Sequence, residues 1–132
     1  MASTLFTGLG LVGTSYAQHA VKRGGSVVFY DVAPRKDFLA NKLGSANVTV
    51  VQRDIRDLPA LIETIQKHKC ETVIHTAGLI GGKVANPIYS GLQINVMGTI
   101  NVAKAVRLTG VKRLVQISTF AIYDRRQGEP TP

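Results

Sequence analysis

The sequence predicts an α/β fold in which helices cover both faces of a parallel sheet. Three observations support this prediction. Short apolar runs alternate with stretches of helical periodicity along the chain. The runs are almost continuously apolar, which is typical of strands buried on both faces. A glycine-rich turn follows the first run and opens the first helical stretch. We therefore expect a doubly wound sheet with strand order 3-2-1-4-5, right-handed crossovers and an end after the fifth strand.

Each element has its own signal in the sequence. The expected strands are residues 5–7, 26–31, 47–52, 72–76 and 111–118, and the expected helices are residues 11–23, 36–43, one opened by the N-cap Asp57, and 87–109. In the first helix we expect Val12, Tyr16 and Ala20 to form the stripe that packs on the sheet. The last helix contains Gly91 and Gly98, where we expect irregular geometry.

Length and composition indicate one globular domain spanning residues 1–132. Hydrophobic residues make up 45% of the 132 residues and charged residues 18%, which is ordinary for a folded chain. The single cysteine, Cys70, excludes an internal disulfide and a Cys-x-x-Cys pair, and we expect it to be a buried structural thiol. No signal peptide pattern and no apolar run near ~18 residues is present, so we expect a protein without a membrane span that is cytoplasmic, with an organelle matrix as the open alternative.

The basic balance does not predict a nucleic-acid partner. Sixteen Lys and Arg residues against eight Asp and Glu residues give a net charge of +8. The basic residues are scattered in ones and twos, and several fall at helix C-termini, where cations suit the helix dipole. No basic stripe interleaved with aromatic residues exists. An alternative explanation for the charge is that an acidic part of a longer protein is missing.

The glycine turn has the pattern of a dinucleotide-binding loop. Gly8 permits a tight turn out of the strand, Gly10 carries no Cβ that would block a pyrophosphate, and Gly13 lets the helix approach the sheet. The helix N-terminus at Leu11, Val12 and Gly13 would offer free N–H groups and a partial positive charge to phosphates. The alternative is a strand-to-helix turn that binds nothing.

Asp31 ends the second strand, 23 residues after Gly8. A carboxylate at this place is positioned to accept hydrogen bonds from the hydroxyls of an adenosine ribose. It would also repel a 2′-phosphate, so the sequence favours NAD over NADP, although Arg35 or Lys36 could partly offset that repulsion. We expect the ligand at the carboxyl ends of the strands, around the reversal of strand order between strands one and four.

Further motifs at these strand ends resemble a known family. They are Thr7-Gly8, Asp54-Ile55-Arg56-Asp57, Val73-Ile74-His75-Thr76-Ala77, Asn95-Val96-Met97-Gly98-Thr99, and the run from Val111 through Ser118-Thr119-Phe120-Ala121-Ile122-Tyr123. With these motifs nearly the whole chain resembles the N-terminal half of an extended short-chain dehydrogenase/reductase, also called the NAD-dependent epimerase/dehydratase family. The resemblance implies a Rossmann-type domain.

The resemblance implies roles for individual residues. Asp54 would hydrogen-bond the adenine amino group, and Ile55 would lie against the ring. Thr76, Ala77 and Gly78 would bring backbone close to the ribose and phosphates of the cofactor.

Two residues further along are implicated by the same resemblance. Asn95, counted with the cofactor site, would support the active-site end of the long helix. Thr119, four residues before Tyr123, matches the catalytic Ser/Thr of the family, which hydrogen-bonds the carbonyl or hydroxyl of the substrate. No metal site is expected.

The chain departs from the family pattern in two ways. The family usually spaces its glycines Thr-Gly-x-x-Gly-x-x-Gly, whereas Leu11 and Thr14 stand at the later positions here. The family also carries a Tyr-x-x-x-Lys pair, in which the tyrosine is the acid/base, and no tyrosine of this chain has lysine four residues later. We therefore expect a fragment or truncated product of an enzyme.

Three interpretations of function stay open at this point. The first is the cofactor-binding half of an oxidoreductase, epimerase or dehydratase that transfers hydride to or from a nucleotide sugar, steroid or similar alcohol or ketone. The complete protein would bind a small-molecule substrate, and a homodimer is left open. The second is a non-catalytic NAD(P)-binding module, and the third is an inactive truncation whose last strand leaves an exposed edge.

Overall fold

The computed structural model describes residues 3–44 and 48–119. A five-stranded sheet runs in the order β3-β2-β1-β4-β5, and every neighbouring pair is parallel. This is the order that the sequence predicts. The strands are β1 (Ser3–Thr7), β2 (Ser26–Asp31), β3 (Val48–Gln52), β4 (Cys70–His75) and β5 (Arg113–Gln116).

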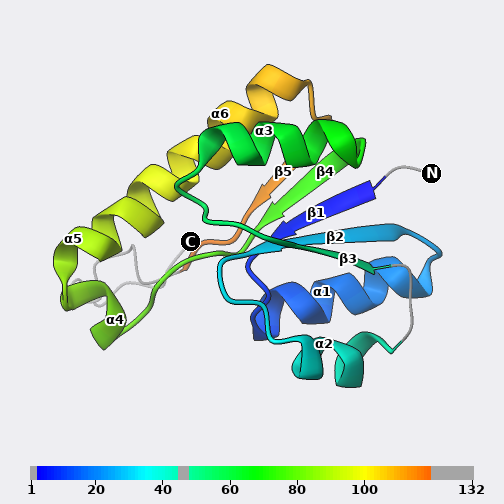
Figure 1. The fold of residues 1–132 in the computed structure, drawn as a ribbon, viewed down its shortest axis with the longest axis horizontal. Helices are drawn as coiled ribbons and strands as arrows, with labels where there is room; N and C mark the ends of the chain where they lie inside the picture. The colour runs from blue at the N-terminus through cyan, green and yellow to red at the C-terminus, as the bar shows by residue number, and fades with distance from the viewer. Residues whose placement is uncertain (1–2, 45–47, 120–132) are drawn as a thin grey trace, which may run out of the picture.

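Two pairs of helices cover the sheet, one pair on each face (Figure 1). The larger apolar cluster joins Leu5, Val28 and Val73 of the sheet to residues of α3 (Leu58–Lys67) and α6 (Gly98–Thr109). The second cluster lies on the other face and joins Phe6 and Phe29 to residues of α1 (Leu11–Lys22) and α2 (Lys36–Leu43). Alternate residues of one strand thus serve opposite faces, as a doubly covered sheet requires.

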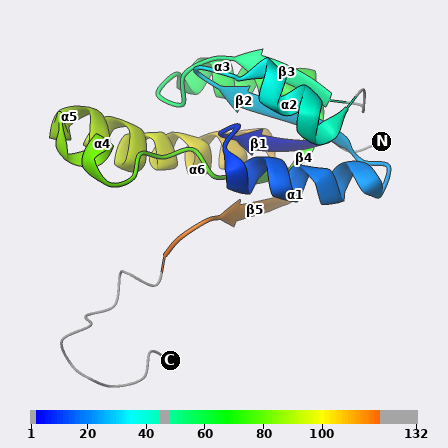
Figure 2. The same ribbon diagram turned by 90° about the horizontal axis from the view of Figure 1, so that it is seen from below.

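The last helical region is one rod built from three segments. Helix α4 (Gly82–Ala85) precedes it, and the rod itself runs through α5 (Ile88–Gly91), the π-helical segment η1 (Leu92–Met97) and α6. The irregular geometry expected at Gly91 and Gly98 is therefore confirmed, because these glycines flank the π segment. Figures 1 and 2 both show α4 and α5 extending past the sheet on the side of the strands' carboxyl ends.

The prediction for the buried face of α1 is wrong for Val12 and Tyr16, whereas Ala20 packs against the second apolar cluster as predicted. Val12 and Tyr16 are 46% and 51% exposed, whereas the buried residues of the helix are Gly13, Thr14 and Ala17. The reason is the close approach of the helix to the sheet at Gly13, which sets the rotation of the helix. Small residues are needed on that face, so the larger side chains point outward.

Other expectations for single residues are confirmed. Cys70 is a free, buried thiol, and burial raises its pKa to about 11. Asp57 caps α3 by accepting a hydrogen bond from the Ala60 N–H at 3.0 Å.

Over the described ranges 3–44 and 48–119, no helix has both the length and the apolar character needed to cross a membrane, and no cluster of potential metal ligands occurs.

Candidate functional site

The glycine turn between β1 and α1 is closely packed on one side and open on the other. Gly8 has a φ of +93°, and a Cβ there would lie 2.9 Å from the backbone N of Ala77. A Cβ on Gly13 would lie 2.5 Å from the carbonyl oxygen of Gly8. A Cβ on Gly10 would meet nothing within 4 Å. Gly8 and Gly13 therefore serve the fold, while the space beside Gly10 is free for a ligand.

The N-terminus of α1 has no side-chain cap. Gly10 is the N-cap residue and offers no capping hydrogen bond, and the first turn contains no acidic residue. Leu11 and Val12 begin the helix with exposed side chains. The first N–H groups of a 12-residue helix together with its dipole then favour an anion at this end.

Asp31 connects the glycine turn to the end of β2. Its Oδ2 accepts a hydrogen bond from the backbone N–H of Leu9 at 2.6 Å, and its Oδ1 accepts one from the N–H of Ala33 at 2.8 Å. An ionised carboxylate has about four acceptor positions, so each oxygen can accept one further bond. Asp31 is thus positioned by the turn and still able to bind hydroxyl groups.

A cavity of about 350 Å³ opens where the carboxyl ends of β1, β2, β3 and β4 meet. It lies at the reversal of strand order, where ligands of open α/β sheets bind. Its lining residues come from four loops, the end of β2 and the π segment: Gly8, Leu9, Gly10, Tyr30, Asp31, Val32, Arg53, Asp54, Ile55, Arg56, Thr76, Ala77, Gly78, Leu79 and Ile94.

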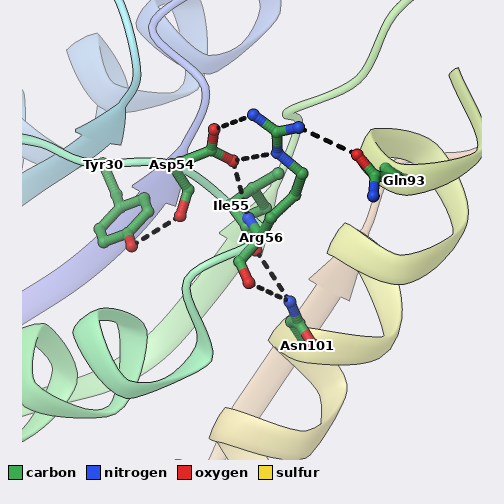
Figure 3. A network of polar contacts seen from close by, with 6 residues as sticks. All are labelled: Tyr30, Asp54, Ile55, Arg56, Gln93 and Asn101. Atoms are coloured by element: carbon green, nitrogen blue, oxygen red, sulfur yellow. Dashed lines mark hydrogen bonds and ion pairs between the residues drawn. The ribbon is translucent and has the colours of Figure 1, made fainter. Parts of the chain in front are cut away.

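The loop between β3 and α3 forms one wall of the cavity, and a polar network holds it (Figure 3). The guanidinium of Arg56 donates to both carboxylate oxygens of Asp54, at 3.0 Å and 2.6 Å. These hydrogen bonds hold the pKa of the Asp54 carboxyl below its usual range. The buried Tyr30 hydroxyl donates to the Asp54 carbonyl at 2.9 Å, and burial raises the pKa of that phenol. Asn101 of α6 donates to the carbonyls of Ile55 and Arg56.

The loop after β4 forms the opposite wall. The Thr76 hydroxyl donates to the carbonyl of Thr7 at 2.7 Å, which ties this loop to the end of β1. The side-chain amide of Asn95 both accepts from the Leu79 N–H at 2.7 Å and donates to the Leu79 carbonyl at 2.8 Å. Gly78 makes room for that amide, because a Cβ there would lie 3.3 Å from Asn95 Oδ1.

A buried histidine lies directly beneath this wall. His75 is 1% exposed and contacts Thr7 through Nδ1 and Thr99 through Nε2. The Thr99 hydroxyl donates to the Asn95 carbonyl, so Nε2 donates to Thr99 and Nδ1 accepts from Thr7. Burial lowers the pKa of His75 to about 4, which keeps the imidazole neutral.

The cavity brings together most of the residues that the sequence singles out. Eight of the predicted residues line it: Gly8, Gly10, Asp31, Asp54, Ile55, Thr76, Ala77 and Gly78. Five are not among its lining residues: Leu11, Val12, Gly13, Asn95 and Thr119. Of these, Gly13 and Asn95 support the walls from behind. Thr119 lies exposed, three residues beyond the end of β5. Tyr123 is outside the described residues.

Several lining residues were not predicted as site residues from the sequence, among them Arg56, Arg53 and Ile94. A signal for Arg56 was available, because it stands two residues from Asp54, where a short side-chain pair can form. Arg35, considered for NADP, instead stacks on Phe38 at 4.8 Å from the ring centroid. The cations that line the cavity are Arg53 and Arg56.

Fold and cavity together define a doubly wound α/β domain of the nucleotide-binding type. A family model, the NAD dependent epimerase/dehydratase family, matches residues 5–132. The UDP-glucose 4-epimerase of Klebsiella pneumoniae is 32% identical over 122 residues, covering 88% of this chain and 87% of that protein. The chain therefore belongs to the NAD-dependent epimerase/dehydratase family.

Longer relatives show how much of such a protein the chain spans. The UDP-glucose 4-epimerase of Neisseria gonorrhoeae is 31% identical over 93% of this chain but only 38% of its own length. A UDP-glucose-4-epimerase from Stenotrophomonas maltophila, solved with bound NAD and formylated UDP-arabinopyranose, matches with a TM-score of 0.87 and 25% identity over 99% of this chain and 41% of that one. The Bordetella bronchiseptica enzyme WbmG, solved with NAD and UDP, gives a TM-score of 0.83 and 27% identity over 98% and 41% of the two chains. The chain thus spans about two fifths of these longer relatives.

Proposed function

We propose that residues 1–132 form the NAD-binding portion of an epimerase, dehydratase or dehydrogenase that acts by hydride transfer on a nucleotide sugar or a similar alcohol or ketone. The observation that supports this most directly is the shared cavity. The open side of the glycine turn, the Asp31 carboxylate and the Asp54 loop all line one space of about 350 Å³. A pyrophosphate at α1, a ribose at Asp31 and a base between the two walls would fill it in that order.

The relatives support the identity of the cofactor and the class of substrate. The family description names NAD, and two neighbouring structures contain NAD with a UDP-sugar or UDP. NADP fits less well because Asp31 places a negative charge where a 2′-phosphate would lie. The missing Tyr-x-x-x-Lys pair would suit a non-catalytic module, but the family and the NAD-bound neighbours support the cofactor-binding portion of an enzyme better.

In the complete protein the small-molecule substrate would lie beyond the nicotinamide end of the cavity. Thr119 would hydrogen-bond its carbonyl or hydroxyl oxygen, and an acid/base elsewhere would move the proton. We propose no nucleic-acid partner, because the basic residues form no stripe, and we place the protein in the cytoplasm. A homodimer of the complete protein is compatible with this proposal.

Ligand-induced stabilisation tests the proposal. At 100 times its Kd, NAD should stabilise the native state by roughly 2.7 kcal/mol, because it binds the folded chain and not the unfolded one. The measurement is the thermal unfolding midpoint with and without NAD, with nicotinamide alone as the control. An unchanged midpoint at millimolar NAD and NADP would show that no competent cofactor site exists.

Replacing Asp31 tests the assignment of the ribose end. Asp31→Ala removes the acceptor, and we expect NAD affinity to fall about tenfold or more. Asp31→Asn keeps an oxygen for the Leu9 N–H but removes the charge, so the ratio of NADP to NAD affinity should rise. Calorimetric titration of both variants measures these changes. If NAD affinity of Asp31→Ala equals that of the wild type, the carboxylate is not the ribose ligand.

A further inference from the structure

The Asp54 carboxylate accepts three hydrogen bonds from one residue, Arg56. Its Oδ1 accepts from the backbone N–H of Arg56 at 2.9 Å and from Arg56 Nε at 3.0 Å, and its Oδ2 accepts from Arg56 Nη2 at 2.6 Å. Both residues line the cavity. Figure 3 shows the guanidinium lying across the carboxylate as a fork. Such a two-point contact fixes the orientation of the carboxylate as well as its charge.

Arg56 is itself held from the other side. Its Nη1 donates to Oε1 of Gln93 at 3.0 Å, and Gln93 belongs to the π segment η1 (Figure 3). The Gln93 amide nitrogen donates to the Tyr89 hydroxyl at 3.0 Å, which turns the amide oxygen toward Arg56. The guanidinium therefore bridges the Asp54 loop and η1, which both contribute residues to the lining of the cavity.

The contacts with Arg56 leave the Asp54 carboxylate little capacity to accept further hydrogen bonds. An ionised carboxylate offers about four, two on each oxygen. The two positions on Oδ1 are occupied by Arg56, and one of the two on Oδ2 is occupied as well. One acceptor position is left, on Oδ2. A ligand group at this place must donate a hydrogen bond, because a second acceptor would face an ionised carboxylate that has no proton to give.

We propose that Arg56 is a positioning residue that makes this end of the cavity selective for a base with an amino group, by holding the Asp54 carboxylate with a single free acceptor position. This inference rests on the proposed function, since it assumes that a dinucleotide occupies the cavity. It concerns how Asp54 selects the base, and Arg56 itself need not touch the ligand. An adenine presents an amino group, whereas hypoxanthine presents a carbonyl oxygen in its place.

The test compares NAD with nicotinamide hypoxanthine dinucleotide, in which a carbonyl oxygen replaces the 6-amino group of the base and the neighbouring ring nitrogen N1 carries a proton. Affinities of both are measured by isothermal titration calorimetry for the wild type and for Arg56→Met, which keeps the side-chain stem and removes the fork. The matched control is Lys112→Met. It removes the same charge and breaks the exposed Lys112–Glu71 ion pair, which does not line the cavity.

We expect the wild type to prefer NAD by about tenfold or more, as for a hydrogen bond to a charged group. Arg56→Met should reduce that preference to about threefold or less, while Lys112→Met keeps it. Arg56→Lys, which restores the charge without the fork, should recover only part of it. If Arg56→Met lacks the circular dichroism spectrum of the wild type, Arg56→Lys takes its place in the comparison. An unchanged preference for NAD in the folded variant overturns the inference.

The outcomes separate the inference from the proposed function. A wild type that binds both dinucleotides equally, or an Arg56→Met variant with full preference for NAD, overturns the role of Arg56 and leaves the NAD site intact. A wild type that binds neither dinucleotide overturns the proposed function and this inference with it. An equal loss of preference in Lys112→Met assigns the effect to net charge and also overturns the inference.

Discussion

His75 shows how one buried side chain connects the sheet to the cavity wall. Its two ring nitrogens contact Thr7 of β1 and Thr99 of α6, and Thr99 donates to the carbonyl of Asn95. The amide of Asn95 in turn holds the backbone of Leu79, which lines the cavity. Because every polar group in this series of hydrogen bonds has a partner, the neutral imidazole can be buried without an unsatisfied polar atom.

The neutral state of His75 predicts an acid-sensitive fold. The unfolded chain binds a proton at His75 near pH 6.5, whereas the folded chain binds it only near pH 4. The contribution of the neutral His75 to the free energy of unfolding is therefore fully present above pH 6.5 and is lost as the pH falls toward 4. The total loss is on the order of 3 kcal/mol. Denaturant unfolding at several pH values measures it. His75→Gln should lack this part of the pH dependence, and the exposed His19→Gln should keep it; equal slopes for both variants would contradict the assignment.

In the turn between β1 and α1, one glycine, Gly13, is needed for folding and another, Gly10, for binding. Ala is compatible with the backbone of Gly10, at φ −94° and ψ −172°, and its Cβ would meet nothing within 4 Å. We expect Gly10→Ala to leave the free energy of unfolding within about 1 kcal/mol of the wild type. The same Cβ would enter the space assigned to the pyrophosphate, so NAD affinity should fall tenfold or more.

Gly13→Ala is the matched variant in the same turn. Its Cβ would lie 2.5 Å from the Gly8 carbonyl oxygen and 2.9 Å from the Thr76 hydroxyl, so the helix must move away from the sheet. We expect a loss of about 1–3 kcal/mol in unfolding free energy. Urea denaturation and NAD titration of both variants give the comparison. If Gly10→Ala destabilised the fold as much as Gly13→Ala, the two glycines would not have separate roles.

The charge of the whole chain predicts how its stability responds to salt. A net charge of +8 repels itself in the folded state, and the ion pairs Arg56–Asp54 and Lys112–Glu71 are solvent-accessible. Raising NaCl from 10 mM to 150 mM shortens the screening length from about 30 Å to about 8 Å. The thermal unfolding midpoint should therefore rise, and the affinity for an anionic dinucleotide should fall. A midpoint that falls with NaCl would show that attractive pairs outweigh the repulsion.

Local patterns predicted the strand order and the place of the cavity, because parallel strands put their carboxyl ends at one edge. The buried face of α1 was predicted wrongly at Val12 and Tyr16, although Gly13 was already assigned to the sheet. Ala17 follows it at the four-residue spacing of a helix face and is fully buried. The contact between Arg56 and Gln93 could not be predicted, because it joins residues 37 positions apart whose distance depends on how the loop and the rod pack.

The π segment between α5 and α6 has a consequence for the angular phase of the rod. A π turn holds one residue more than an α turn, so α6 is rotated relative to a regular continuation of α5 by about one residue, or ~100°. Gln93 and Asn95 of η1 can thereby reach Arg56 and Leu79, while Val102 of α6 lies buried in the core. Deleting one residue within Leu92–Met97 would remove this phase difference, so one of the two sets of contacts would be lost.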